Sequence, residues 1–395
     1  MGVTESKRAN AAGRLLRYGM VGGGPGSFIG DVHRKALALD GMAVLKAGCF
    51  SSRPKATRST GESLGLEADR LYDDWREMAK AEASREDGID FVVVVTPNHL
   101  HAPVAKAFLE SGISVACDKP LAVSSAECRE LEALAGAKGL EFCVTYTYSG
   151  YAAVKEASAI VAEGTLGEIR FVKAEYPQEF FAGLAEAAGN KQAEWRFDPA
   201  RSGPVGTLGD VGTHVEHLVS YITGLRLKRL AARLGTIVPG RRLDDTATVM
   251  TEYEGGAAGL YWACQAAPGE GNDLNISVYG TLGALSWRQE EPEILRIGML
   301  GEAGRIWRRG RDSAHPMTSA FSRFPAGHPE GFLEAFANIY RAYCSSVSNR
   351  VSGIAGSPGF AGQGDYPRVS DGTSGILFCE ACLASSRTGS TWIDL

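Results

Sequence analysis

A glycine-rich turn near the N-terminus constrains the fold of this chain more than any other feature. Residues 15–21 are mostly apolar and predict a short buried strand, and the sequence G-G-G-P-G-S-F-I-G follows at residues 22–30. A helical pattern then continues to about Leu39. Glycines between a strand and a helix let the backbone approach a pyrophosphate, and the start of the helix supplies N–H donors. We therefore predict that this turn binds a dinucleotide through Gly22, Gly24, Gly26 and Gly30.

The spacing of these glycines departs from the usual G-x-G-x-x-G. Gly22 and Gly24 match the first two positions, whereas Gly30 comes three residues later than the expected third. Gly24, Gly26 and Gly30 form a G-x-G-x-x-x-G pattern instead. The sequence therefore leaves open which glycine lies closest to the pyrophosphate.

Strands and helices alternate over the first third of the chain. Apolar stretches at residues 43–50, 89–95, 114–117 and 141–145 predict further strands, with a helix at about 103–111. This alternation predicts a doubly wound parallel sheet and thus a Rossmann dinucleotide-binding domain, which we place at residues 14–145.

The pattern changes after about residue 146. A helix at 152–163 is followed by longer strands with alternating apolar and polar residues, expected at 169–176, 229–238, 246–253, 257–265 and 275–279. Helices are expected at 331–347 and 373–386, on either side of a Gly/Ser/Pro-rich loop at 348–367. Strands that are grouped in this way predict an α/β domain with a large open, mostly antiparallel sheet. We assign residues 146–395 to this domain and expect it to bind the substrate and to form the oligomer.

Composition and charge exclude several classes of protein. The net charge is −5 with both signs dispersed, so no nucleic-acid partner is expected, and no apolar run approaches a membrane span. The polar residues 1–12 lack the apolar stretch of a secretory signal and predict a loose tail. Eight cysteines without a paired framework predict reduced thiols and a cytoplasmic protein. Cys379 and Cys382 form a C-x-x-C inside an apolar helical pattern, which favours buried packing over metal binding.

The end of the second expected strand bears on the choice of cofactor. An acidic residue there would bind a free ribose 2′-hydroxyl, but the sequence has Ser51, Ser52 and Arg53, with Lys55 and Arg58 nearby. Hydroxyls and a guanidinium suit a 2′-phosphate, so the sequence favours NADP over NAD. The alternative is that Arg53 is only a solvated loop residue.

Two further segments follow expected strands, and a third lies in the C-terminal half. They are T-P-N-H-L-H at residues 96–101, C-D-K-P-L at 117–121 and G-D-V-G-T-H at 209–214. Together with the glycine-rich turn they resemble the Gfo/Idh/MocA family of sugar and inositol oxidoreductases, over about residues 17–395. The resemblance implies that the cofactor lies across the ends of the parallel strands and that the substrate lies between the two domains. It also implies a cis bond before Pro120 and a homodimer or homotetramer that pairs through the open sheet, around residues 257–279. The cofactor contacts expected beyond the glycines are Ser51, Ser52, Arg53, Thr96, Pro97, Asn98, His101 and Lys119.

Lys119, Asp210 and His214 are the expected catalytic residues. Lys119 follows a parallel strand, where an ammonium can stabilise a developing alkoxide, and the family lysine of this motif lies beside the reacting hydroxyl. Asp210 and His214 are four residues apart and would share one face of a helix, with the carboxylate orienting the imidazole and raising its basicity. We expect Lys119 and His214 to accept the hydroxyl proton while the hydride passes to the nicotinamide. The alternatives are a surface lysine, a packed histidine and an aspartate that caps a helix. No cluster of zinc ligands is recognisable, so no metal is expected.

Weaker candidates for substrate binding are Gln178, Arg196 and His328, besides Lys119, Asp210 and His214. Gln178 and Arg196 could equally be structural, and the residues around His328 also fit an ordinary helix start. Thr147 and Ser149 stand where many relatives have the asparagine and arginine of an N-x-R-x-x-P motif, so no particular sugar or inositol is predicted.

Two other functions remain open on this sequence. One is a redox-neutral glycosidase that uses tightly held NAD as a transient oxidant. The other is a non-enzymatic nicotinamide sensor on the same fold. The intact set of Lys119, Asp210 and His214 favours a dehydrogenase over the sensor.

Overall fold

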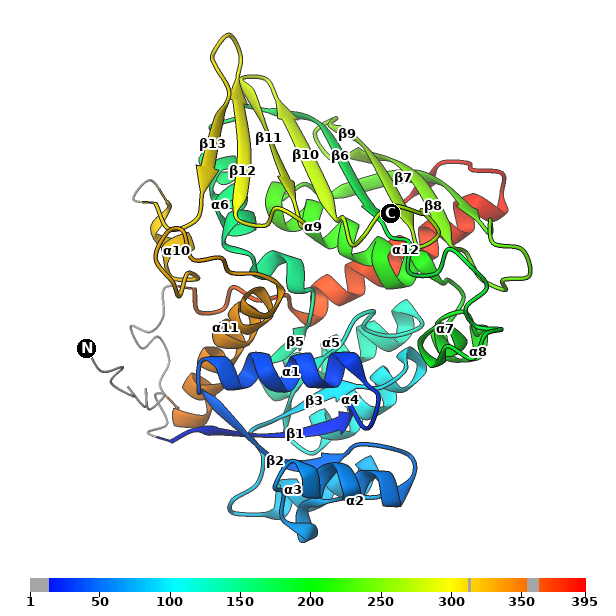
Figure 1. Ribbon diagram of the computed structural model, residues 1–395, viewed down its shortest axis with the longest axis vertical. Helices are drawn as coiled ribbons and strands as arrows, with labels where there is room; N and C mark the ends of the chain where they lie inside the picture. Colours follow the sequence, from blue (N-terminus) through cyan, green and yellow to red (C-terminus); the bar gives the residue numbers. More distant parts are fainter. Residues whose placement is uncertain (1–13, 312–313, 354–361) are drawn as a thin grey trace.

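The computed structural model describes residues 14–311, 314–353 and 362–395, which form two β-sheets with helices packed against each (Figure 1). The expected tail at residues 1–12 lies outside the described residues, as does most of the Gly/Ser/Pro-rich loop. No described helix is long and apolar enough to cross a membrane.

The first sheet has five parallel strands in the order β2-β1-β3-β4-β5, as expected for a Rossmann domain. Its central strand has the sequence F-V-V-V-V and is buried at every residue, because helices cover both faces of a parallel sheet. The strand order reverses beside β1, and open α/β sheets bind their ligands at the carboxyl ends of the strands that flank such a point, here β1 and β3. The strands are β1 (Leu16–Gly22), β2 (Ala43–Cys49), β3 (Phe91–Val95), β4 (Ser114–Cys117) and β5 (Phe142–Val144). The helices are α1 (Phe28–Leu39), α2 (Pro54–Ser63), α3 (Trp75–Ser84), α4 (His101–Glu110) and α5 (Ser125–Lys138).

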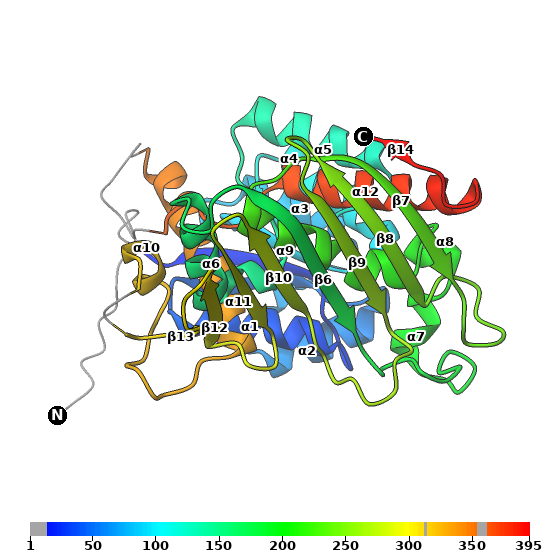
Figure 2. The same ribbon diagram turned by 90° about the horizontal axis from the view of Figure 1, so that it is seen from above.

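The second sheet has nine strands in the order β13-β12-β11-β10-β6-β9-β8-β7-β14. Every pair in it is antiparallel except β6 with β9, which run parallel. One face packs on α6 (Ala152–Ala162), α9 (Thr213–Thr223) and α12 (Val369–Arg387), whereas the other face is open, as Figure 2 shows. The strands are β6 (Ile169–Pro177), β7 (Leu227–Gly235), β8 (Thr246–Tyr253), β9 (Ala258–Cys264), β10 (Asn275–Gly280), β11 (Gly283–Arg288), β12 (Ile294–Met299), β13 (Arg305–Arg308) and β14 (Ile393–Asp394).

The expectation of a mostly antiparallel open sheet is confirmed, but its size is underestimated from the sequence. Strands β11, β12 and β13 are only four to six residues long and place arginines or glycines among their apolar residues, which weakens their sequence signal. They pair one after another at the edge of the sheet.

Two C-terminal helices connect the two parts of the chain. Helix α11 (Phe332–Ser352) returns to the parallel sheet and packs on α1, where the ring of Tyr343 meets the ring of Phe91 edge-on at 5.3 Å. Helix α12 packs on α5, on β5 of the first sheet and on β7 of the second, so it contacts both sheets. Cys379 and Cys382 of α12 are buried free thiols, which agrees with their expected role in packing.

Candidate active site

The glycine-rich turn is shaped by close backbone contacts. A Cβ on Gly22, whose φ is +86°, would lie 2.5 Å from the carbonyl oxygen of Val95, and a Cβ on Gly30 would lie 2.5 Å from the Cα of Gly23. Gly30 therefore lets α1 pack tightly against the turn, which is the role of the third glycine in the usual fingerprint. Gly26, with a φ of +80°, faces open space. The additional residues of the motif form a turn that ends at Ser27, whose hydroxyl accepts a hydrogen bond from the Gly30 N–H and caps α1.

The residues at the carboxyl end of β3 fit a dinucleotide. The side-chain oxygens Oγ1 of Thr96 and Oδ1 of Asn98 are buried and have no hydrogen-bond partner among the described residues. Buried polar atoms are normally paired, so these two oxygens are free to bind ribose or nicotinamide groups. The Asn98 amide nitrogen donates to the Ser202 carbonyl at 3.2 Å and so connects the two parts of the chain.

His101 links two loops at the carboxyl ends of the parallel strands. Its ring is 1% exposed, and its two nitrogens lie 2.8 Å from the carbonyl oxygens of Thr96 and Pro120. The ring therefore ties the end of β3 to the loop after β4.

The end of β2 carries unneutralised positive charge. Arg53 and Lys55 are exposed and their side chains form no ion pair with a described residue, whereas Arg58 is paired with Asp73 at 3.2 Å. The Ser51 hydroxyl accepts a hydrogen bond from the Arg53 N–H at 3.2 Å. Ser52 is exposed beside them.

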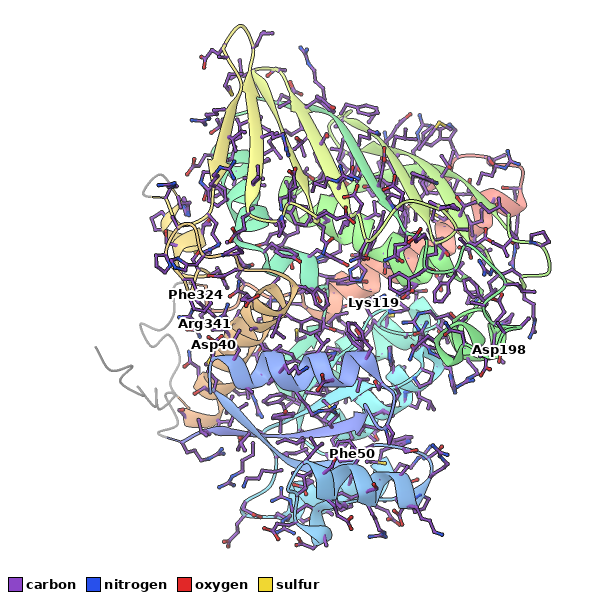
Figure 3. All side chains as sticks on the ribbon, viewed as in Figure 1. Asp40, Phe50, Lys119, Asp198, Phe324 and Arg341 are labelled. Carbon is purple, nitrogen blue, oxygen red and sulfur yellow. The ribbon has the colours of Figure 1, made fainter. Side chains whose placement is uncertain are left out.

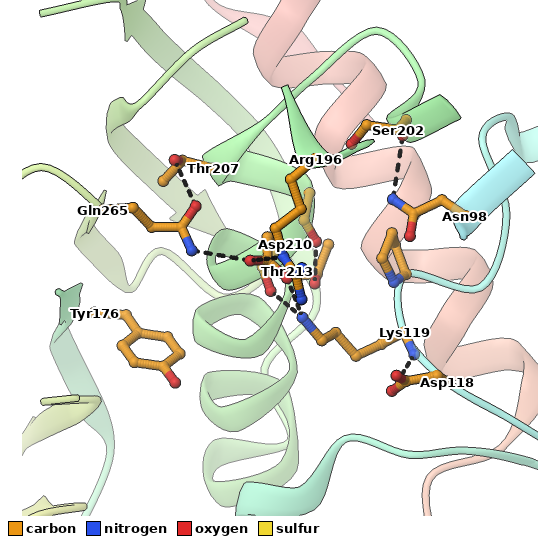
Figure 4. Close-up of polar contacts among 12 residues, drawn as sticks. Asn98, Asp118, Lys119, Tyr176, Arg196, Ser202, Thr207, Asp210, Thr213 and Gln265 are labelled. Atoms are coloured by element: carbon orange, nitrogen blue, oxygen red, sulfur yellow. Dashed lines mark hydrogen bonds and ion pairs between the residues drawn. The ribbon is translucent and has the colours of Figure 1, made fainter. Parts of the chain in front are cut away.

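Lys119 and Asp210 join the two parts of the molecule. Lys119 follows β4, its peptide bond to Pro120 is cis as the resemblance implied, and it lies between the two sheets (Figure 3). Its ammonium lies 2.6 Å from Oδ1 of Asp210 and 2.5 Å from the Asp210 carbonyl oxygen (Figure 4). An ammonium has three N–H donors, so one remains for another ligand.

The carboxylate of Asp210 is held by three side chains. Besides Lys119, it accepts hydrogen bonds on Oδ2 from Arg196 at 3.1 Å and from Gln265 at 2.9 Å (Figure 4). Burial alone raises the pKa of Asp210, but the charges of Lys119 and Arg196 outweigh burial and hold this pKa well below its usual value. Asp210 therefore remains ionised.

His214 lies one turn further on, in a helical stretch with an unusual start. Residues Leu208–Gly212 form a π-helical turn that leads into α9, a feature that is frequent at functional sites. His214 is 7% exposed, and its Nδ1 is buried without a partner among the described residues. The expected orienting contact from Asp210 is not seen in the described structure, because both Asp210 oxygens bind Lys119, Arg196 and Gln265 instead.

The surroundings of His214 favour a neutral ring. Burial, followed by the positive charge of Lys119, lowers the pKa of His214 well below its usual value, although Asp210 acts in the opposite direction. The ring lies edge-on to those of Tyr148 and Tyr146, with centroid distances of 4.8 and 5.6 Å. A neutral imidazole beside an ammonium can accept a proton at pH 7.

A chain of neutral polar side chains continues from Asp210. The Gln265 amide nitrogen also donates to Oε1 of Gln178 at 3.1 Å, and Gln178 in turn hydrogen-bonds Asn272. Asn272 accepts a hydrogen bond from the Tyr176 hydroxyl at 2.8 Å, and Tyr176 hydrogen-bonds Tyr148 beside His214. Gln178 was expected here from the sequence, but Gln265, Asn272 and Tyr148 were not.

The pairing of two strands explains why these residues meet. β6 and β9 run parallel with Pro177 opposite Cys264, so Gln178 and Gln265 lie side by side just beyond the strand ends. Their positions at strand ends are visible in the sequence. The parallel pairing of β6 with β9 is not visible in the sequence, because β7 and β8, which lie between them in the chain, form antiparallel pairs.

The remaining expected residues have different placements. Arg196 ends α7 (Lys191–Arg196) and reaches Asp210, so it belongs to the cluster. His328 is exposed in the loop between α10 (Pro316–Ser319) and α11, and no hydrogen bond or ion pair joins it to the cluster within the described residues. Thr147 and Ser149 are buried and bond to carbonyl oxygens of Thr145 and Tyr146, so neither hydroxyl supplies a site contact.

A glycine cradle at the switch point of a parallel sheet, together with a partly buried lysine–aspartate pair and a neutral histidine, defines a dinucleotide-dependent oxidoreductase. Residues 16–146 match the model of the oxidoreductase family with an NAD-binding Rossmann fold, and residues 154–286 match the Gfo/Idh/MocA C-terminal domain. The chain belongs to the Gfo/Idh/MocA family and is an NAD(P)-dependent dehydrogenase that acts on alcohols.

Known relatives match over nearly the whole chain. The chain is 34% identical to the uncharacterised oxidoreductase YfiI of Bacillus subtilis, with 96% of each chain covered. It is 36% identical to an inositol dehydrogenase homolog of Azotobacter vinelandii crystallised with NAD+, with a TM-score of 0.92 over 97% of this chain and 98% of that one. It is also 27% identical to the levoglucosan dehydrogenase of Pseudarthrobacter phenanthrenivorans, over 96% of this chain and 98% of that protein.

Proposed function

We propose that this protein oxidises a secondary hydroxyl of a sugar, an inositol or a related cyclic polyol, with Lys119 and His214 handling the proton. The observation that carries this proposal is the Lys119 ammonium, which is bound to Asp210 and lies in the same cluster as the neutral ring of His214. Hydride transfer from a hydroxyl-bearing carbon requires removal of the hydroxyl proton, and these groups can stabilise and accept it.

Each residue of the cluster has a distinct role in the proposed reaction. The remaining N–H of Lys119 donates to the substrate oxygen and stabilises its developing negative charge. His214 accepts the proton. Asp210 stays ionised and holds Lys119 in place, while Arg196 and Gln265 hold Asp210. The bound nicotinamide supplies the hydride acceptor, and reduction of a ketone reverses these roles.

The substrate class is supported by the neutral groups of the cluster. Gln178, Asn272 and two tyrosines bring neutral amides and hydroxyls next to the Lys119–Asp210 pair, and groups of this kind recognise substrate hydroxyls. The inositol dehydrogenase homolog has been crystallised with NADH and myo-inositol, and levoglucosan dehydrogenase with NADH and levoglucosan. The two ligands, myo-inositol and levoglucosan, are both compact cyclic polyols.

We infer three further properties. NADP is favoured over NAD, because Arg53 is exposed at the end of β2, forms no ion pair with a described residue and could bind a 2′-phosphate there. Self-association through the open sheet is supported by outward-facing Phe171, Met250, Tyr279 and Ile306, which are 39–55% exposed. A cytoplasmic location is supported by eight buried free thiols.

An absorbance assay at about 340 nm, where reduced nicotinamides absorb, tests the proposed function. Purified protein is incubated with NAD or NADP and a panel of monosaccharides, anhydrosugars, inositols and glycosides, with Lys119→Ala as the matched control. We expect reduction of the cofactor with a cyclic polyol and a loss of at least about 100-fold in kcat in Lys119→Ala. Glycoside cleavage without net cofactor reduction would instead indicate the redox-neutral glycosidase. Binding of the cofactor without any turnover would indicate a sensor.

A further inference from the structure

Asp244 holds the start of the helical stretch that carries Asp210 and His214. It lies in the connection between β7 and β8 and is 7% exposed. Its Oδ1 accepts a hydrogen bond from the Gly206 N–H at 2.6 Å, and its Oδ2 accepts one from the Leu208 N–H at 2.7 Å. Its main-chain oxygen accepts a third from the Thr207 N–H at 2.9 Å.

These three donors lie at the start of the helical stretch: Gly206 immediately precedes it, and Thr207 and Leu208 are its first two residues. Such groups have no partner within a helix, and a carboxylate facing them is favoured by the positive end of the helix. The contact is tight, because a Cβ on Gly206 would lie 2.6 Å from the Asp244 carbonyl oxygen. Asp244 thus caps this helix from 36 to 38 residues away in the sequence.

The capped segment controls much of the cluster. Asp210 follows Leu208 by two residues, and His214 lies one turn beyond it. The Thr207 hydroxyl donates to Oε1 of Gln265 at 2.9 Å, which turns the Gln265 amide nitrogen toward Asp210. A displacement of this segment therefore moves Asp210 and Gln265 together.

We propose that Asp244 is a positioning residue whose ionised carboxylate holds the Asp210–His214 segment in its reactive geometry, and that protonation of Asp244 sets the acid limit of activity. The proposal rests on the proposed dehydrogenase function. Both carboxylate oxygens accept an N–H, so a proton on either oxygen places an O–H against a donor and removes one of the two bonds.

The surroundings of Asp244 bring its pKa into the pH range over which enzyme activity can be measured. Burial, and to a smaller degree the charge of Asp245, raises the pKa of Asp244 to about 6, against the effect of its backbone donors. Asp245 is itself paired with Arg241 at 3.3 Å, and the thiols of Cys379 and Cys382 on α12 also face Asp244. The pKa values of Asp210 and His214 both lie well below their usual values, so neither group accounts for a transition near pH 6.

The first test is the pH profile of kcat/KM for the wild type, Asp244→Asn and the control Asp245→Asn. The wild type should lose about tenfold per pH unit below about pH 6. Asp244→Asn should be weaker at neutral pH by roughly 10- to 100-fold, since a displaced site reacts slowly, and its acid limb should be absent. Asp245→Asn should keep the acid limb, moved to slightly lower pH because the charge of Asp245 raises the pKa of Asp244. An unchanged acid limb in Asp244→Asn would overturn the proposal.

The second test does not depend on activity or on the variant folding. Hydrogen-exchange protection of the amides at residues 206–212 is measured on the wild-type full chain between pH 7.5 and 5, an interval that brackets the expected transition at about pH 6. Protection factors, which correct for the intrinsic effect of pH on exchange, should fall below about pH 6. Constant protection would refute the proposal. A fall in protection in a chain without dehydrogenase activity would retain the positioning role and reject the proposed function instead.

Discussion

Replacing Glu216 by glutamine removes an ionisable group from the core without changing its shape. Glu216 lies on α9, is 8% exposed and forms no hydrogen bond or ion pair within the described residues. Burial, with a smaller contribution from the negative charge of Asp371, raises the pKa of Glu216 from 4.5 to about 8. The carboxyl group is therefore mostly neutral at pH 7 in the folded protein but ionised in the unfolded chain.

The sign of the effect on stability follows from this difference. Between pH 4.5 and about 8 the folded chain binds more protons at this residue than the unfolded chain, so wild-type stability falls as the pH rises. At about 1.4 kcal/mol per pKa unit, the loss is about 1 kcal/mol at pH 5, about 3 kcal/mol at pH 7 and about 5 kcal/mol at pH 9. Glutamine stays neutral throughout, so Glu216→Gln should gain up to these amounts.

Urea unfolding followed by tryptophan fluorescence at pH 5, 7 and 9 measures this gain. Glu62→Gln, an exposed glutamate on α2, serves as the control and should change the free energy of unfolding by less than about 0.5 kcal/mol at each pH. The reasoning is refuted if the gain in Glu216→Gln does not increase from pH 5 to pH 9, or if the variant is less stable than the wild type at pH 9.

Two further predictions concern the cofactor and the assembly. Arg53→Ala should weaken NADPH binding by roughly 10-fold or more and leave NADH binding unchanged, because only a 2′-phosphate gains charge-assisted bonds from the guanidinium. Fluorescence titration with both cofactors measures these affinities. An equal effect on both cofactors would contradict the NADP preference. Light scattering at micromolar concentration should give two or four times the chain mass of 41.9 kDa, because outward-facing Phe171, Met250 and Ile306 become buried between copies. A mass of one chain would count against the proposed self-association.

Local sequence patterns were sufficient to predict the class of fold. The valine-rich stretch before residue 96 predicts a fully buried strand, because β-branched residues favour strands and a strand covered on both faces has no polar side. The glycine-rich turn is visible because only glycine tolerates the backbone conformation of Gly22 and the close approach of Gly30. Lys119, Asp210 and His214 were recognisable from short motifs, since the residues of each motif are neighbours in the chain.

Only the tertiary structure decided which side chains meet these residues. The sequence suggested that Asp210 orients His214, but the fold brings Lys119, Arg196 and Gln265 to the Asp210 carboxylate from three separate segments. His328 was an equally reasonable candidate, and the path of the loop after α10 leaves it exposed, with no described contact to the cluster. Asp244 could not be recognised as a cap from the sequence, because its donors are 36 to 38 residues away. A sequence pattern reports the local backbone conformation and which face of an element is buried. Contacts between distant residues depend on strand order and register, as in the parallel pair of β6 and β9 that places Gln178 beside Gln265.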